Sequence, residues 1–233
     1  MSDLMEIGGQ FFLWAMATAV AGSILKVNPF DQPDVESSKK NTRALLEHFV
    51  AIDSVGATKV PSLPVAEQPL LTEDGITLYT NMAVEKKDSL KDVLCMLIES
   101  TGTDDYIAID PYLEQTESIH KALQSIRALL GQKKNIATTL GYGPAYLHSS
   151  GQLQKGGPRK ILALIISSEA IDDIQIPGKN YTFGTLAIAQ AIGDYQSLCQ
   201  NQHRVIRIHL GADIDAGLNT LIQFFRFSNS NQF

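Results

Sequence analysis

An apolar segment without a charged side chain, residues 11–25, constrains the fold of this chain more than any other feature. The segment is long enough for about four turns of helix, and apolar side chains would lie on every side of that helix. A helix that is apolar all round has to be buried on all sides, which a single neighbouring helix cannot achieve. The segment therefore predicts packing against a sheet or against further helices, in this chain or in a larger assembly.

A membrane span and an export signal are the alternative interpretations of this segment. A spanning helix needs about 20 apolar residues, whereas this run contains Thr18 and Ser23 and ends at Lys26. A signal peptide has a basic start, whereas Asp3 and Glu6 precede the run. We therefore predict a helix packed within protein, no membrane partner and a cytoplasmic location, with a membrane-anchored chain as the remaining alternative.

Two helices are predicted at the start of the chain, over residues 5–26 and 33–52, with a tight connection between them. Pro33 suits the first turn of the second helix, because an N–H at that position has no intrahelical partner in any case. We assign residues 1–55 to one structural segment, followed by a proline-containing linker over residues 56–70.

The second predicted helix has one apolar face. The residues that recur on it at helical spacing are Val35, Thr42, Leu46 and Phe49. Lys39 is predicted to lie on the same face, four residues after Val35. A buried ammonium group requires an anion or a functional reason, because an unpaired buried charge is costly. Lys39 is therefore the strongest candidate site residue in the chain.

Residues 22–39 also carry a set of residue types in a fixed spacing. They are Gly22, Ile24, Leu25, Phe30, Asp31, Gln32, Val35, Glu36 and Lys39. This spacing resembles the C-terminal signature of the glucose-6-phosphate isomerase family. The family usually has glycine where Asp34 stands, and an acidic side chain suits this position because it complements the dipole of the helix.

The resemblance implies an aldose–ketose isomerase that interconverts glucose 6-phosphate and fructose 6-phosphate. It also implies that the N-terminal helical pair, residues 1–55, completes the sugar-isomerase-type domain of that enzyme. It implies that Lys39 assists ring opening and handles charge on the substrate oxygens, and that Gln32 hydrogen-bonds the substrate. We expect no cofactor and no metal. The catalytic base and the ring-opening histidine of the family lie upstream of anything that matches this chain. We therefore expect the chain to be inactive alone and to need the remainder of the isomerase, in the same polypeptide or in a separate one.

Residues 138–158 resemble a motif in the C-terminal extension of bacterial proteins that fuse transaldolase to this isomerase. Residues 176–184 and 204–210 continue the similarity. Ala145 and Gln154 stand where the family is expected to have arginine and histidine. These differences weaken the case for ligand binding by this part of the chain.

The same segment contains a candidate loop site made of His148, Ser149, Ser150 and Lys155. Neighbouring glycines would let backbone amides face a phosphate, and Lys155 would add positive charge. The spacing does not match a P-loop. A structural or interface role for the loop is the alternative.

Beyond the linker, short apolar runs alternate with amphipathic ones. The predicted strands are residues 76–80, 106–109, 136–140, 161–167 and 205–210, and the predicted helices are residues 89–99, 117–130, 186–200 and 216–227. This alternation predicts an accessory α/β domain over residues 71–233, built on a roughly five-stranded mixed sheet.

Composition bears on the choice of partners. The formal net charge of −6 and the lack of a lysine or arginine cluster argue against a nucleic-acid partner. Cys95 and Cys199 are too few and too far apart for a disulfide framework or a zinc site. A sugar phosphate and the remainder of the isomerase are the expected partners, and homo-oligomer formation is left open. The alternative function is a non-catalytic docking or regulatory module with at most sugar-phosphate binding.

Overall fold

The computed structural model describes residue 3 and residues 5–53, 68–84, 89–170 and 172–227, without the side chains of residues 48–53 and 227. By internal contacts the chain forms two compact units, Met1–Pro33 and Asp34–Phe233. The predicted linker over residues 56–70 lies largely outside the described residues, and the predicted domain boundaries remain predictions. The helix that begins at Pro33, α2 (Pro33–Asp53), belongs to the second unit apart from Pro33 itself.

The first unit consists mainly of one helix, α1, Glu6–Leu25, which confirms the predicted helix. Its only buried residue is Gly22, and Trp14 for example is 69% exposed. A Cβ on Gly22 would lie 2.7 Å from the Cδ atom of Pro29, so the turn after α1 needs glycine there. Within the first unit, the described residues do not provide the predicted burial of α1. The helix is long and apolar enough to cross a membrane, but a core helix or a signal sequence passes the same test.

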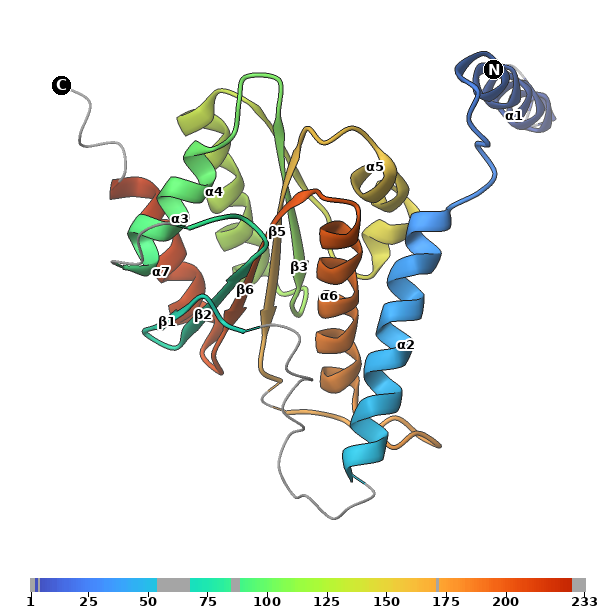
Figure 1. Ribbon diagram of the computed structural model, residues 1–233. Coiled ribbons are helices and arrows are strands. Elements are labelled where there is room, and N and C mark those ends of the chain that lie inside the picture. The colour runs from blue at the N-terminus through green and yellow to red at the C-terminus, as the bar shows by residue number, and fades with distance from the viewer. Residues whose placement is uncertain (1–2, 4, 54–67, 85–88, 171, 228–233) are drawn as a thin grey trace. The chain divides into compact units, whose positions relative to one another are not determined.

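The second unit is built on a mixed sheet in the order β1-β2-β6-β5-β3-β4 (Figure 1). The strands are β1 (Leu71–Glu73), β2 (Ile76–Thr80), β3 (Tyr106–Tyr112), β4 (Ala137–Leu140), β5 (Ile161–Ser168) and β6 (Arg204–Leu210). β4, β3, β5 and β6 are parallel, whereas β2 pairs antiparallel with β6 and β1 antiparallel with β2. The predicted α/β class and mixed sheet are confirmed, with six strands described instead of five.

The additional strand, β1, results from a tight hairpin with β2. Asp74 and Gly75 form the two-residue turn, with φ angles of 50° and 76°. An Asp-Gly pair favours this type of turn because both residues tolerate positive φ. β1 is only three residues long, which is too short for a periodic pattern to predict it.

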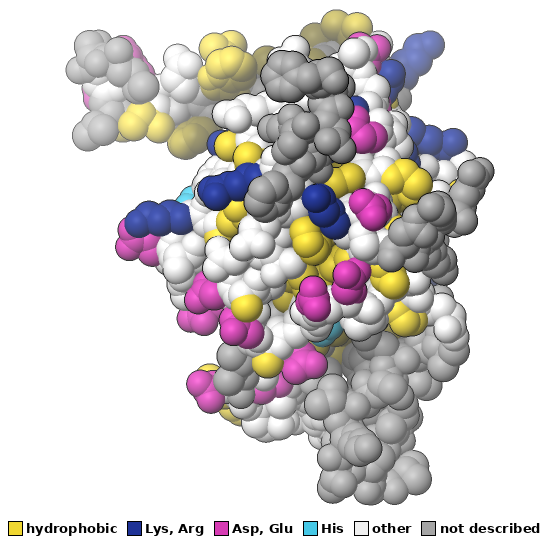
Figure 2. Space-filling view, turned by 90° about the vertical axis from the view of Figure 1, so that its left-hand side faces the viewer, with side chains coloured by type: hydrophobic (Ala, Val, Ile, Leu, Met, Phe, Trp, Pro, Cys, Tyr) yellow, Lys and Arg dark blue, Asp and Glu magenta, His cyan; other side chains and the backbone are white. Residues whose placement is uncertain are grey.

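Helices cover both faces of the sheet (Figure 1). One face carries α3 (Leu90–Glu99), α4 (Glu117–Lys134) and α7 (Ile214–Phe227), which share a large apolar core with the strands. The other face carries α6 (Phe183–Gln200), and α2 (Pro33–Asp53) packs against α6 through a cluster that includes Leu45, Leu46, Ala189 and Ile192. On the face shown in Figure 2, the described residues mix acidic, basic and apolar side chains and form no continuous basic surface.

The contact between α2 and α6 is close because residue 193 is glycine. A Cβ at Gly193 would lie 2.9 Å from the carbonyl oxygen of Ser38. The predicted buried positions Val35, Thr42 and Leu46 are confirmed, while the side chain of Phe49 lies outside the described residues.

The segment predicted as a glycine-rich loop is largely helical. After β4 it forms a 3₁₀ turn, η1 (Ala145–His148), and a short helix, α5 (Gly151–Gly156). The helix was missed because its two bounding glycines are weak helix formers.

Candidate functional site

Lys39 lies at the edge of the packed face of α2, and its side chain is 39% exposed. The fully buried position next to it is occupied by Ser38, which corrects the expectation of a buried ammonium group. The Lys39 Nζ atom lies 2.6 Å from the Glu36 Oε1 atom, and the Glu36 side chain is 61% exposed. The hydrogen bond and the charge of Lys39 lower the pKa of the Glu36 carboxyl. Lys39 is thus a solvent-accessible cation with an exposed counter-ion.

Gln32 is exposed and belongs to the first unit. The residue two positions later, Asp34, is the anchor of α2 in the second unit. Its Oδ2 atom accepts from Nε2 of Gln152 at 2.5 Å and its Oδ1 atom from Nδ2 of Asn201 at 2.7 Å. Its backbone N–H donates to Gln152 Oε1 at 3.1 Å. These bonds join the start of α2 to α5 and to the end of α6.

Substituting Asp34 with alanine is expected to lower the free energy of unfolding by about 1–3 kcal/mol, because two side-chain hydrogen bonds to a carboxylate are lost. Urea unfolding followed by circular dichroism measures the change. Lys40→Ala, at an exposed position of the same helix, serves as the control and should change stability by less than about 0.5 kcal/mol. Equal stabilities of the two variants would contradict the anchoring role.

A buried polar cluster lies between the sheet, α5 and α6. Lys155 and Asp194 are almost completely buried, with 3.4 Å between Nζ and Oδ1. Tyr112 donates to Asp194 Oδ2 at 2.5 Å, and Tyr146 donates to the same atom. The Lys155 ammonium donates to the Tyr146 hydroxyl at 2.9 Å and lies 4.7 Å from the centre of its ring. Burial and the Asp194 charge raise the pKa of both phenols well above the usual value.

Asp110, on β3, is a second buried carboxyl group in this region. Its Oδ1 atom accepts from Nε2 of Gln154 at 3.3 Å, and its Oδ2 atom has no hydrogen-bond partner among the described residues. Burial raises the pKa of Asp110 to about 7, although the charge of Lys155 and the bond from Gln154 oppose this shift. A carboxyl group in this state can hold a proton near neutral pH.

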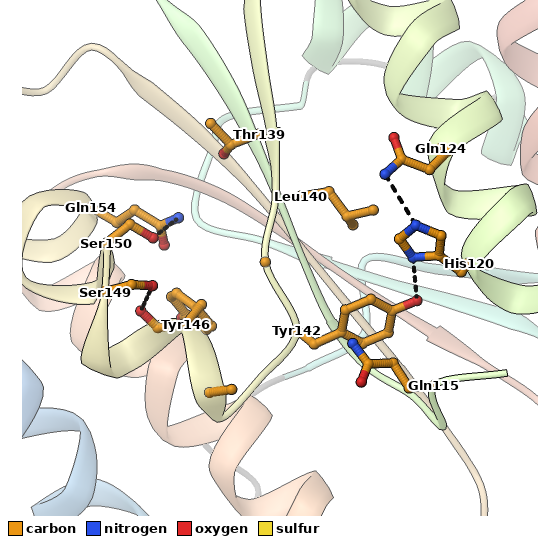
Figure 3. A pocket seen from close by; sticks show the side chains of 12 residues that line it. Gln115, His120, Gln124, Thr139, Leu140, Tyr142, Tyr146, Ser149, Ser150 and Gln154 are labelled. Atoms are coloured by element: carbon orange, nitrogen blue, oxygen red, sulfur yellow. Dashed lines mark hydrogen bonds between the residues drawn. The ribbon is translucent and has the colours of Figure 1, made fainter. Parts of the chain in front are cut away.

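A cavity of about 440 Å³ lies beside this cluster, at the carboxyl end of β4 (Figure 3). Of the predicted loop site, Ser149 and Ser150 line the cavity. His148 is exposed and is not part of the lining. Lys155 also lies outside the lining, and its ammonium group is engaged by Asp194 and Tyr146. The structure therefore separates the four residues of the predicted loop site.

Sequence reasoning missed several residues of this region. His120 and Gln124 come from α4, Tyr142 from the loop after β4, and Asp110 from β3. A polar residue within an apolar, parallel strand is a usable signal for Asp110, because ligand sites in such sheets lie at the carboxyl ends of strands. Among the described residues, no three His, Cys, Asp or Glu side chains are grouped to hold a metal ion.

Comparison with known proteins links one short segment of the chain to a family of enzymes. The glucose-6-phosphate isomerase of Fusobacterium nucleatum is 55% identical to this chain over 41 residues, and that of Heliobacterium modesticaldum is 51% identical over 41 residues. The match covers 18% of this chain and 9% of each isomerase, so the chain spans about a tenth of the length of these relatives. No protein-family model matches the chain.

Comparison with solved structures found a distant likeness. A hypothetical protein from Thermus thermophilus superimposes with a TM-score of 0.47 and 19% sequence identity. The superposition covers 59% of this chain and 37% of the other. This likeness is too weak to bear on fold or function.

Proposed function

We propose that this chain is the C-terminal part of a glucose-6-phosphate isomerase of the bacterial type that is fused to transaldolase. The observation that carries the isomerase assignment is the identity of 51–55% to two isomerases over 41 residues. The fused type is proposed from the resemblance of residues 138–158 alone. The spacing from Phe30 to Lys39 supports it, because it matches a signature of that family. The reaction interconverts glucose 6-phosphate and fructose 6-phosphate in glycolysis and gluconeogenesis, and the enzyme acts in the cytoplasm.

Aldose–ketose isomerisation transfers a proton between C1 and C2 of the sugar through a cis-enediol. The reaction needs a base, groups that open the ring, and a cation near the developing negative charge. Lys39 supplies the cation in our proposal, and Gln32 donates a hydrogen bond to the substrate. The Lys39–Glu36 pair is compatible with this role, because an exposed ion pair of this kind contributes little and is readily exchanged for a substrate anion.

The remainder of the isomerase supplies the base and the ring-opening histidine, so the chain is inactive alone. α1 supports the need for such a partner. Large apolar side chains that are more than half exposed lie along this helix: Phe11, Phe12, Leu13, Trp14, Val20, Ile24 and Leu25. Apolar surface of this extent marks a contact with protein or with a membrane, and we propose that the upstream part of the isomerase covers it.

A chimeric enzyme tests the proposal. The 41-residue segment of the Fusobacterium nucleatum isomerase is replaced by the matching segment of this chain, taken to include residues 22–40. We expect the chimera to isomerise fructose 6-phosphate. In that chimera Lys39→Ala should lower kcat/KM by about 10- to 100-fold, the loss typical of a charged hydrogen bond of about 1.5–3 kcal/mol.

Lys40→Ala is the matched control, because Lys40 is the exposed neighbour of Lys39 on the same helix. It should leave kcat/KM unchanged within about twofold. A Lys39→Ala chimera as active as its parent would refute the role of Lys39. An inactive but folded parent chimera would count against the isomerase assignment as a whole.

The second candidate function is a non-catalytic docking or regulatory module. Ala145 and Gln154 favour it, because they replace residues expected in the fused isomerases. The Lys155–Asp194 pair also favours it, because a paired Lys155 does not face a phosphate. A thermal-shift measurement with a phosphorylated sugar acid distinguishes a module that binds sugar phosphates from a module that only docks. A ligand at a hundred times its dissociation constant stabilises by roughly 2.7 kcal/mol, and no shift would leave docking alone.

A further inference from the structure

The cavity at the carboxyl end of β4 is built from three separate parts of the chain (Figure 3). α4 supplies His120 and Gln124, residues 139–142 supply the floor, and the η1–α5 segment supplies the opposite wall. The size of the cavity, about 440 Å³, lies within the range of small-molecule sites. It is large enough for one or two sugar-sized rings.

One wall holds a buried amide whose hydrogen bonding within the described residues is incomplete. Gln154 is 3% exposed and lines the cavity. Its Nε2 atom donates to Asp110 Oδ1 at 3.3 Å and to Ser150 Oγ at 3.4 Å, whereas its Oε1 atom has no hydrogen-bond partner in the described part of the chain. A buried acceptor without a partner is costly. In this conformation the Oε1 atom is closed to solvent, so it accepts a hydrogen bond from a ligand hydroxyl when the Gln154 amide turns toward the cavity that its side chain lines.

The other wall holds a chain of polar groups beside an aromatic ring. The His120 and Tyr142 rings are stacked, with 6.0 Å between their centres and an angle of 20° between their planes. The His120 Nδ1 atom lies 3.3 Å from the Tyr142 hydroxyl, and its Nε2 atom lies 3.3 Å from Nε2 of Gln124 (Figure 3). These groups provide both hydrogen-bond donors and acceptors, and Tyr142 adds a ring face against which C–H groups can pack.

The described residues that line the cavity include no lysine, arginine, aspartate or glutamate. A phosphate or carboxylate ligand would therefore find no fixed cation in this lining, and the nearby Lys155 ammonium is bound to Asp194 and Tyr146. An apolar ligand would leave the amide, hydroxyl and imidazole groups without partners. The remaining class is an uncharged ligand with many hydroxyl groups.

We propose that this cavity binds a neutral carbohydrate, a monosaccharide or a disaccharide, held between the Gln154 amide and the His120–Tyr142 pair. The site does not involve Lys39 or Gln32 and does not depend on the isomerase assignment. Its ligand differs from the substrate of that reaction because it carries no phosphate.

Titrations of the ¹⁵N-labelled chain with glucose, galactose and maltose test the proposal, with amide chemical shifts as the readout. We expect saturable shifts for at least one of these sugars, centred on residues 139–150. Gln154→Leu and His120→Phe should each weaken binding by about tenfold or more, the loss expected when a hydrogen bond of about 1.5 kcal/mol is removed. Ser125→Ala, on α4 outside the cavity lining, is the control and should bind like the parent.

Gln154 also contacts Asp110, so weaker binding by Gln154→Leu alone could report a local rearrangement of the core. His120→Phe, at an exposed position, provides the second variant without that contact. Three results would overturn the proposal. One is that none of the three sugars causes saturable shifts, even at concentrations high enough to detect weak, millimolar binding. Another is binding that neither substitution weakens. The third is tighter binding of glucose 6-phosphate than of glucose in this cavity, because a site without a cation should not favour the phosphate.

Discussion

Lys155→Met is expected to lower the free energy of unfolding by about 3–5 kcal/mol, the cost of leaving one partner of a buried ion pair without the other. The Lys155 and Asp194 side chains are 0% and 1% exposed, so water cannot replace the missing ammonium. The substitution also removes the hydrogen bond to the Tyr146 hydroxyl and the contact with its ring. Urea unfolding at neutral pH, followed by circular dichroism, measures the loss.

A surface ion pair provides the matched control. Lys160 lies 3.6 Å from Asp104, and both side chains are more than half exposed. Lys160→Met should change stability by less than about 1 kcal/mol, because exposed pairs contribute little. Equal stability of the two methionine variants would show that the buried Lys155–Asp194 pair contributes no more than an exposed pair.

The double variant Lys155→Met, Asp194→Asn tests how much of the loss comes from the unpaired charge of Asp194. Asparagine keeps an acceptor oxygen for Tyr112 and Tyr146 but removes the unpaired negative charge. The double variant should therefore be less destabilised than the sum of the two single variants, with a coupling energy of about 0.5–3 kcal/mol. Additive effects would show that the two side chains do not interact.

The second large effect is a dependence of stability on pH that comes from Asp110. Its pKa in the folded chain is about 7, raised by burial from an ordinary value of 3.8. Below the unfolded value the carboxyl is protonated in both states and contributes nothing to the pH dependence. As the pH rises toward 7, the unfolded chain releases the proton while the folded chain retains it, so stability is lost. Above about pH 7 both states are ionised and the loss levels off.

The size of this effect follows from the shift. Each pH unit between the two pKa values costs about 1.4 kcal/mol, so the total is of the order of 4 kcal/mol. We expect the stability of the parent to fall relative to that of Asp110→Asn between about pH 4 and pH 7. Subtracting the free energy of unfolding of the variant from that of the parent at each pH removes the contribution of the groups that titrate in both proteins. A difference that stays constant, or that rises in favour of the parent, would contradict a raised pKa.

Local patterns were sufficient for most of the secondary structure. Strands such as Ile161–Ser168 are continuous apolar runs, and helices such as Glu117–Lys134 have an apolar stripe and a capping threonine, Thr116. The short β1 strand and α5 were missed. One is too short for a period to be seen, and the other lies between glycines that favour turns.

The candidate site was less accessible to such reasoning. Helical spacing predicted that Lys39 faces inward on α2, which is wrong, because Ser38 occupies the buried position and the Lys39 side chain is 39% exposed. The close approach at Gly193 of α6 decides this, because the helix backbones meet at Ser38. A residue far away along the chain therefore sets the environment of the candidate lysine.

Sequence alone determined the α/β class, the order of its main elements and the likeness to an isomerase signature, because periodicity and residue spacing are local properties. Only the tertiary structure decided the role of Lys155, for which the sequence left open a phosphate contact or a structural role and which folding buries against Asp194. It also decided that Gln154, His120 and Tyr142 line one cavity. The physical reason is that buried polar groups take the partners that packing brings to them, and those partners lie far away along the chain.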